Sequence, residues 1–313
     1  MSEVNLALAV GHQEADLPVS WLKRDIILYT IGIGAKADEY NIVNELDPNW
    51  TPFPTYPVAL MFKGDDADVN DFKKRVGGST AKGLPTFDPN RGVHGTQSIE
   101  VLKPIPAVSG PGWRLTKRIV GVSENKSGII VEHEQTLVGP DGQAYARLFG
   151  SSFNIGAKGT GEKFSKRIAG PPTAKPIPKD RKPDWVVTER TSPEQAIIYR
   201  LSGDYNGLHI DPKIGQATGF GGVILHGLSS FGFAARGIIK TAGGGDPSSL
   251  KLFGVRFSSP VKPGEVLETS IWEVGPGPNG TTELTFAMKN LQTGKVCLSN
   301  GIAYVKKTEK SKL

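Results

Sequence analysis

The feature that most constrains the fold is a weak internal repeat, because two halves of the chain show the same sequence patterns in the same order. Residues 24–32, RDIILYTIG, and residues 194–202, EQAIIYRLS, each place an apolar run around a tyrosine. Two further pairs of segments match in the same order: 101–116 with 259–269, and 137–142 with 291–298. We therefore expect two copies of one supersecondary unit.

The second half indicates what that unit is. After a glycine-rich stretch, residues 224–240 place apolar side chains at helical spacing, namely Leu228, Phe231, Ala235 and Ile238. Strand-like runs separated by Pro-Gly and Gly-rich turns follow at 251–257, 266–274, 282–290 and 296–305. One long apolar helix followed by antiparallel strands predicts an α+β fold with a sheet around a helix. Residues 94–155 of the first half show the same strand-rich pattern, with a weaker helix signal before it.

A segment rich in proline and basic residues separates the two halves and lacks a periodic apolar pattern. We expect it to be an exposed linker. The predicted organisation is a first repeat at 1–156, the linker at 157–184, a second repeat at 185–308 and a short tail at 309–313.

Composition excludes several classes of protein. The 313 residues are 38% hydrophobic and 22% charged, as in ordinary globular chains. The net charge of +6 lies largely in the linker and the tail, so it does not favour nucleic-acid binding. Cys297 is the single cysteine, which excludes an internal disulfide or a multi-cysteine metal site, and we expect an inert buried thiol. No apolar run is long enough for a membrane span, and no secretory signal is expected.

The last three residues, Ser311, Lys312 and Leu313, form a C-terminal SKL tripeptide. At the end of a chain this tripeptide is the address that the peroxisomal import receptor reads. It follows a polar, lysine-rich stretch that should leave it accessible. The sequence thus predicts a peroxisomal protein.

The most informative chemistry lies in residues 202–212, SGDYNGLHIDP. They follow an apolar run at 196–201, interpreted as a strand or another buried element. Taken singly, Asp204 is an ordinary turn residue and His209 an ordinary structural histidine. Together with Asn206 they place an acid, an amide and an imidazole in one Gly-rich turn, which predicts an acid/base pair directed at one point, such as a bound water.

The dipeptide His226-Gly227 supplies a second element. If a helix begins near Gly227, its free N–H groups and its dipole create a site for an oxyanion. The alternative is a plain helix start at a glycine.

The motif from Tyr199 to Pro212, YRLSGDYNGLHIDP, resembles the hydratase 2 motif of the MaoC-like (R)-specific enoyl-CoA hydratases, in particular the two-repeat peroxisomal type. Other segments stand in the family's order: 24–35, 94–95, 219–228 and 255–257. The resemblance implies a tandem (double) hot-dog fold, in which two long central helices are wrapped by antiparallel sheets. It also implies a degenerate first repeat that widens the acyl pocket, because aligning the tyrosines places Gly34 where Asp204 stands.

The resemblance further implies the reversible syn hydration of trans-2-enoyl-CoA to (3R)-3-hydroxyacyl-CoA in peroxisomal fatty-acid β-oxidation. His209 would be the base, Asp204 the acid, Asn206 the holder of the water and the Gly227 N–H the oxyanion donor. This chemistry needs no metal or redox cofactor.

For the acyl-CoA substrate the resemblance points to His94, Gly95, Lys126, Tyr205, Gly207, Leu208 and Phe257. The sequence alone favours an ordinary solvated lysine in a turn at Lys126 over a phosphate-binding one. A homodimer is also expected. Two departures bear on acyl specificity: Gly207 stands where the family usually has proline, which loosens the backbone, and residues 87–93 are less apolar than in the family.

Other functions remain open from the residues alone. Residues 32–37, GIGAKA, follow an apolar run interpreted as a strand and fit the G-x-G-x-x-A pattern of an NAD-dependent oxidoreductase. The prolines that follow argue against the helix and parallel strand that such a fold requires. A hot-dog thioesterase, a dehydratase of a specialised biosynthetic pathway and a non-catalytic acyl-CoA-binding protein are further alternatives.

Overall fold

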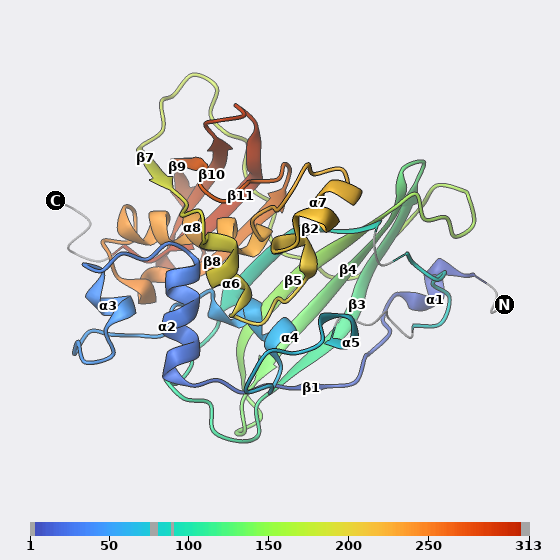
Figure 1. The fold of residues 1–313 in the computed structure, drawn as a ribbon, viewed down its shortest axis with the longest axis horizontal. Helices are drawn as coiled ribbons and strands as arrows, with labels where there is room; N and C mark the ends of the chain where they lie inside the picture. Colours follow the sequence, from blue (N-terminus) through green and yellow to red (C-terminus); the bar gives the residue numbers. More distant parts are fainter. Residues whose placement is uncertain (1–3, 76–80, 89–90, 308–313) are drawn as a thin grey trace.

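A single large antiparallel sheet organises the molecule (Figure 1). The computed structural model describes residues 4–75, 81–88 and 91–307. The first half contributes β1 (Leu17–Pro18), β2 (Gly92–Val101), β3 (Arg114–Asn125), β4 (Gly128–Val138), β5 (Ala144–Ile155) and β6 (Phe164–Arg167). The second half contributes β7 (Trp185–Arg190), β8 (Leu250–Phe257), β9 (Val266–Pro276), β10 (Thr282–Asn290) and β11 (Val296–Val305). The strands predicted in the second half are confirmed to within two residues.

The strand order reproduces the internal repeat. It runs β1-β3-β4-β5-β2-β8-β11-β10-β9-β7, with β6 paired to β3. Read outward from its centre, each side presents the same succession, so β2 corresponds to β8, β5 to β11, β4 to β10 and β3 to β9. The halves join where β2 and β8 pair antiparallel around Ser98 and Gly254. The duplication visible in the sequence is therefore also a duplication of the fold.

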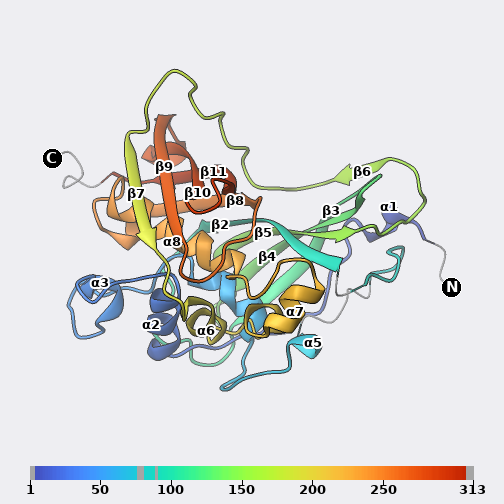
Figure 2. The same ribbon diagram turned by 45° about the horizontal axis from the view of Figure 1, so that its top comes forward.

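The helices of the second half are α6 (Gln195–Arg200), η3 (Gly207–His209), α7 (Pro212–Ala217), α8 (Gly227–Lys240), η4 (Pro247–Ser249) and η5 (Pro278–Gly280). The predicted central helix is α8, which begins at Gly227 and is buried on all sides from Leu228 to Ile239. It lies under the curved sheet (Figure 2). The second repeat is therefore the α+β hot-dog unit that we predicted.

The helices of the first half are α1 (Leu6–Ala9), α2 (Lys23–Gly32), α3 (Tyr40–Val43), η1 (Tyr56–Ala59), α4 (Leu60–Lys63) and α5 (Phe72–Arg75). Only one of the two expected central helices is long. The counterpart of α8 is η1 followed by α4, which together span eight residues. Pro52, Pro54 and Pro57 prevent an earlier start, because proline lacks the N–H that a helix interior requires. Gly64, at φ 60°, ends the segment.

The segments that carry the two aligned tyrosines are helices, whereas residues 196–201 had been interpreted as a strand or another buried element. Helix α2 buries Ile26, Tyr29 and Thr30, at the spacing of a helical face. Helix α6 likewise buries Ala196 and Tyr199 and exposes Ile197. The two helices pack together, and the rings of Tyr29 and Tyr199 lie 5.9 Å apart.

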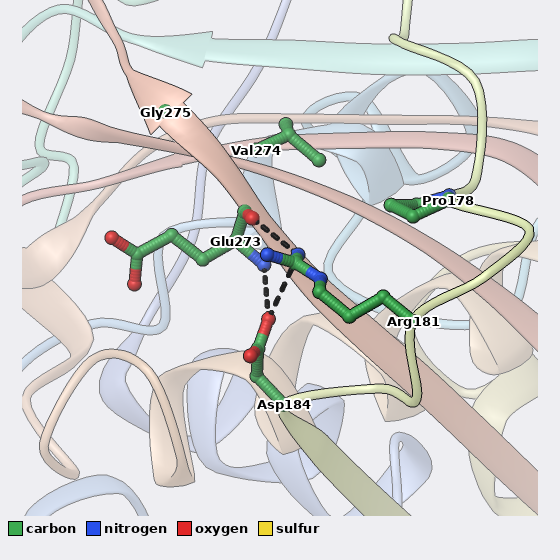
Figure 3. Close-up of a pocket in the computed structure, with 6 residues that line it drawn as sticks. All are labelled: Pro178, Arg181, Asp184, Glu273, Val274 and Gly275. Atoms are coloured by element: carbon green, nitrogen blue, oxygen red, sulfur yellow. Dashed lines mark hydrogen bonds and ion pairs between the residues drawn. The ribbon is translucent and has the colours of Figure 1, made fainter.

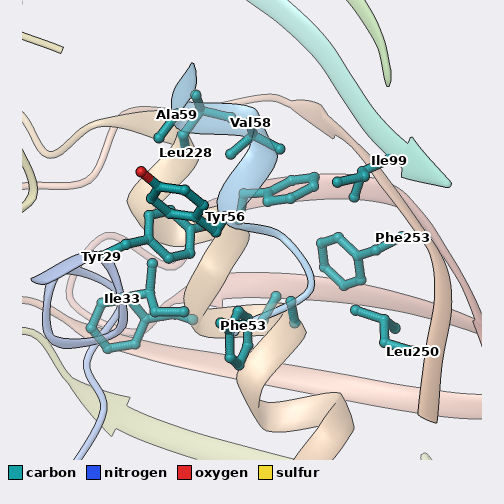
Figure 4. Packing of buried hydrophobic residues seen from close by; sticks show 14 of the residues in the cluster. Tyr29, Ile33, Phe53, Tyr56, Val58, Ala59, Ile99, Leu228, Leu250 and Phe253 are labelled. Carbon is teal, nitrogen blue, oxygen red and sulfur yellow. The ribbon is translucent and has the colours of Figure 1, made fainter. Parts of the chain in front are cut away.

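One hydrophobic core spans both repeats. Figure 4 shows Tyr29, Phe53 and Tyr56 of the first repeat packed near Leu228 and Phe253 of the second. Because both halves contribute to one apolar interior, removing either half would expose the apolar surface of the other.

The connector at 157–184 is mostly exposed, as expected, but it is attached at several points and carries β6. The Glu124 carboxylate accepts hydrogen bonds from the backbone N–H groups of Gly159 and Gly161, at 2.9 and 3.1 Å. Farther along, Lys175 pairs with Glu283 at 2.6 Å. Within the described residues, no helix is both long and apolar enough to cross a membrane.

Candidate active site

The turn that was predicted to hold the acid/base pair joins α6 to α7. Gly203 adopts φ 125°, and a Cβ there would lie 2.6 Å from the backbone nitrogen of Lys63, so the close approach requires glycine. Asn206 caps η3, because its Oδ1 accepts a hydrogen bond from the Leu208 N–H at 3.0 Å. This hydrogen bond holds the Asn206 side chain in the turn, and its role as the holder of the water stays a prediction.

The structure brings Asp204 and His209 together, and it adds His226 to them. One potential ligand atom from each of these three side chains lies within 4.8 Å of the others. The ring of His226 stacks on that of His209, with 3.6 Å between centroids and 25° between planes. Asp204 is half-buried and both histidines are buried.

Hydrogen bonding fixes the form of His209. Its Nδ1 lies 2.8 Å from the carbonyl oxygen of Ile224, just before α8. A carbonyl oxygen only accepts, so Nδ1 carries the hydrogen and the neutral ring has its lone pair on Nε2. His209 is thus oriented as a base whose free nitrogen is Nε2.

Burial favours the neutral form of both groups. It raises the pKa of Asp204, against the opposing effects of nearby His209 and the Asn206 N–H. Burial also lowers the pKa of His209, while Asp204 and the Ile224 carbonyl act in the opposite direction. Both pKa shifts are in the direction of a protonated carboxyl and a neutral imidazole, the forms in which an acid and a base would act.

The predicted oxyanion donor, Gly227, follows His226 directly as the first residue of α8. Its N–H is one of those that lack a partner within the helix. A Cβ at this position would lie 3.0 Å from the Phe257 ring, so glycine permits the strand β8 to approach the helix start. Phe257 therefore lies beside the predicted oxyanion donor.

His94 and Gly95 lie beside this position on β2. The His94 ring is 4.8 Å from that of Phe257, and its Nε2 lies 3.1 Å from Gln97 Oε1. Burial lowers the pKa of His94 to about 4, so it is neutral at physiological pH. The pairing of β2 with β5 is irregular at Gly95, between His94 and Thr96. Four predicted residues thus form one continuous region: Gly227, Phe257, His94 and Gly95.

The remaining predicted substrate residues are more dispersed. Lys126 is exposed in the turn between β3 and β4, and no described contact joins it to the acid/base pair. Tyr205 and Leu208 are half-buried in the catalytic turn, where the Arg200 guanidinium lies 5.0 Å from the Tyr205 ring centroid. Gly207 begins η3, and a Cβ there would meet the Ile214 Cδ1 atom at 2.6 Å. Their roles in binding substrate stay predictions.

The cluster of Asp204, His209 and His226 is poorly shaped for a metal ion, although its residue types are common ligands. An ion must lie near the plane of each imidazole that binds it, about 2.0–2.1 Å from the nitrogen for zinc. Two rings stacked at 3.6 Å and 25° have lone pairs in separate, nearly parallel planes. One ion cannot meet both without a ring rotation.

The first repeat lacks the acid, as predicted. Gly34 adopts φ 83°, and any Cβ there would collide with the Phe233 ring of α8. The NAD-dependent alternative is wrong for this fold, because the G-x-G-x-x-A segment follows helix α2 rather than a strand of a parallel sheet. The targeting residues Ser311, Lys312 and Leu313 lie outside the described residues.

The depression shown in Figure 3 is not this site. It is lined by Pro178, Arg181, Asp184, Glu273, Val274 and Gly275, none of which was predicted to act on substrate. There Arg181 donates to Asp184 Oδ2 at 3.1 Å and to the Glu273 carbonyl, which holds the connector against β9.

Sequence reasoning missed two contributors to the site. It treated Ile224 only as part of a helix, whereas its carbonyl sets the tautomer of His209. It treated His226 only as the residue before a glycine. The sequence does show a second histidine, His226, at the predicted start of the central helix. Its contact with His209, however, depends on tertiary packing.

Comparison with known proteins agrees with the geometry. The family model for the MaoC-like domain matches residues 174–295, and the model for the MFE-2 hydratase 2 N-terminal domain matches residues 20–153. A probable dehydratase, NIT22, of Ajellomyces capsulatus is 37% identical over 308 residues, covering 93% of this chain and 80% of that protein. A peroxisomal enoyl-CoA hydratase 2 of Arabidopsis thaliana is 32% identical over 291 residues, covering 88% and 89%.

Among solved structures, a MaoC-like dehydratase from Phytophthora capsici superposes with a TM-score of 0.86. It is 34% identical, and the match covers 98% of this chain and 99% of that one. The identity extends over nearly the full length of the chain, both family models match it, and its architecture is a double hot-dog. The chain therefore belongs to the MaoC-like hydratase 2 family.

Proposed function

We propose that this protein adds water reversibly to trans-2-enoyl-CoA and forms (3R)-3-hydroxyacyl-CoA. The observation that carries the proposal is the arrangement at the start of α8. There the lone pair on Nε2 of His209, the carboxyl of Asp204 and the free N–H of Gly227 belong to adjoining residues. Hydration of a conjugated thioester requires these three functions, namely a base, an acid and an oxyanion donor.

In this reaction Nε2 of His209 takes a proton from water while the water oxygen bonds to C3. The thioester oxygen becomes an enolate oxygen, which the Gly227 N–H stabilises at the positive end of the helix dipole. Asp204 then gives its proton to C2. A proton passes back from His209 to Asp204 and restores both groups. The balance closes without a metal or redox cofactor, in keeping with the proposed role of CoA thioester as substrate.

The proposed compartment is the peroxisome, where the reaction would serve fatty-acid β-oxidation. The C-terminal SKL supports this proposal, and so does the peroxisomal relative from Arabidopsis thaliana. We further propose that the protein is a homodimer and that His94, Gly95 and Phe257 contact the CoA thioester, because they lie beside Gly227.

The test follows the loss of enoyl-thioester absorbance with 2-enoyl-CoA, together with chiral analysis of the product. We expect the (3R) alcohol. Asp204→Asn and His209→Gln should each lower kcat by at least about 100-fold, as expected for loss of a general acid or base. Asp246→Asn and His12→Gln are matched controls, since Asp246 caps η4 beyond the C-terminal end of α8 and His12 lies beside β3. Both should keep activity within about twofold.

Three results would overturn the proposal: an (S) product, release of free CoA, or undiminished activity in both catalytic variants. Release of free CoA would indicate a thioesterase. A dehydratase of a biosynthetic pathway would use the same groups in reverse, and the name of the Ajellomyces capsulatus relative favours it as the second candidate. Measuring both directions with matched substrates separates the two roles.

A further inference from the structure

His226 contacts each component of the acid/base pair and precedes the oxyanion donor. Its Nε2 lies 3.0 Å from the backbone carbonyl oxygen of Asp204. Its ring stacks on His209 at 3.6 Å, and its other neighbour is the Tyr199 ring, at 4.9 Å and 49°. The next residue is Gly227. One side chain therefore links all three catalytic functions of the proposed reaction.

These contacts fix the tautomer of His226. The Asp204 carbonyl can only accept, so the hydrogen lies on Nε2 and the lone pair on Nδ1. The Nδ1 atom is buried and has no hydrogen-bond partner among the described residues. Burial, followed by the nearby His209, holds the pKa of His226 well below its usual range. A neutral ring is thus kept in one orientation.

A histidine that only filled space in the core would not be expected to leave a buried acceptor unpaired. An unpaired buried polar atom destabilises the folded state, a cost that an apolar residue of the same shape would avoid. At 1% exposure, His226 carries that cost next to the two reactive groups. An unsatisfied buried group calls for a specific explanation, and here the group lies against both proposed reactive residues.

We propose that His226 is a positioning residue for the hydration proposed above, and the inference rests on that function. Its Nε2–H holds the backbone of Asp204, and its ring face holds the imidazole of His209. The carboxyl and the Nε2 atom of His209 are thereby kept at one spacing relative to the start of α8. His226 acts through these neighbours and does not itself transfer a proton.

Three substitutions separate the hydrogen bond from the ring stacking. His226→Gln keeps an N–H near the ε position, His226→Phe keeps a ring without a donor, and His226→Asn places its amide too near the backbone to reach Asp204. We expect the Asn and Phe variants to lower kcat by about 10- to 100-fold, a loss typical of residues that orient a reactive group. KM should change by less than about threefold. The Gln variant should retain more kcat than either.

Thermal unfolding and circular dichroism establish that each variant is folded, and His12→Asn serves as a histidine control away from the site. Wild-type kcat in folded Asn and Phe variants would overturn the inference. So would a Gln variant that is no better than the other two.

A second measurement does not depend on activity. Nuclear magnetic resonance of the 15N-labelled histidines should show an uncharged His226 with its proton on Nε2 at pH 7. A proton on Nδ1, or a charged ring at pH 7, would overturn the positioning role. If the wild-type protein fails to hydrate 2-enoyl-CoA, the proposed function fails, whereas these spectra still test the geometry at His226.

Discussion

Replacing Arg236 by methionine is expected to lower the free energy of unfolding by about 3–5 kcal/mol, because it leaves two carboxylates without their partner. Arg236 lies on α8 with a side chain only 2% exposed. Its Nη1 donates to Glu39 Oε2 at 2.6 Å, its Nη2 to Glu189, and its Nε to the carbonyl of Ile33 at 3.3 Å. The two glutamate side chains are each 15% exposed, so water cannot fully replace the guanidinium.

The loss should be visible as a change in melting temperature. With about 2.1 cal/mol/K of unfolding entropy per residue, a chain of 313 residues gains about 0.7 kcal/mol/K on unfolding. A loss of 4 kcal/mol then lowers Tm by about 6 °C. Differential scanning calorimetry measures this shift directly, and urea unfolding provides a second estimate of the free energy.

Two controls isolate the ionic contribution. The triple variant with Arg236→Met, Glu39→Gln and Glu189→Gln removes all three charges and should recover at least half of the lost stability. Arg190→Met changes an exposed arginine on β7 and should move Tm by less than about 1 °C. The reasoning is refuted if Arg236→Met shifts Tm by less than about 2 °C, or if the triple variant is as unstable as the single one.

Three further predictions concern other parts of the molecule. Burial lowers the pKa of His94 to about 4 from its usual 6.5, so the unfolded chain takes up a proton on this ring at a higher pH than the folded protein does. The free energy of unfolding should therefore decrease as the pH falls from 6.5 toward 4. Urea unfolding measures this decrease, which should be less steep in His94→Gln. Gly207→Pro should raise the free energy of unfolding by about 0.4–1 kcal/mol without loss of kcat. Asn206 already has φ −57° and ψ 124°, which suit a residue before proline, and only the flexible end of Ile214 must move. A lower Tm in this variant would contradict the prediction. Cys297 should react with a thiol reagent only after denaturation, since burial raises its pKa to about 12, and rapid labelling of the native protein would contradict it.

Much of the fold could be predicted from the sequence because its signals are local. The strands of the second repeat alternate apolar and polar residues between Gly and Pro turns, and such alternation reports strand boundaries directly. Residues 196–201 could not be assigned in this way, because a six-residue apolar run fits a strand or a buried helix equally well. The short central helix of the first repeat was predictable from Pro52, Pro54 and Pro57, but the family resemblance implied a long one.

The candidate site was predictable only in part, for a physical reason. Asp204 and His209 lie five residues apart in one turn, so their proximity follows from the sequence. The stacking of His226 on His209 instead depends on how α8 packs beneath that turn, which no local pattern encodes. The same holds for Arg236, whose charge is balanced by Glu39 and Glu189 from opposite halves of the chain.

The packing of α8 leaves no room for a side chain at Gly34 of the first repeat. The Phe233 ring fills the space that such a side chain would need, so an aspartate placed there would have to displace that ring. The first repeat instead supports the working site. The carbonyl of Gly32 accepts hydrogen bonds from Gln195 and Ser229, at 2.8 Å each, and so ties α6 and the start of α8 to α2. The first repeat therefore holds in place the two helices, α6 and α8, that enclose the catalytic turn.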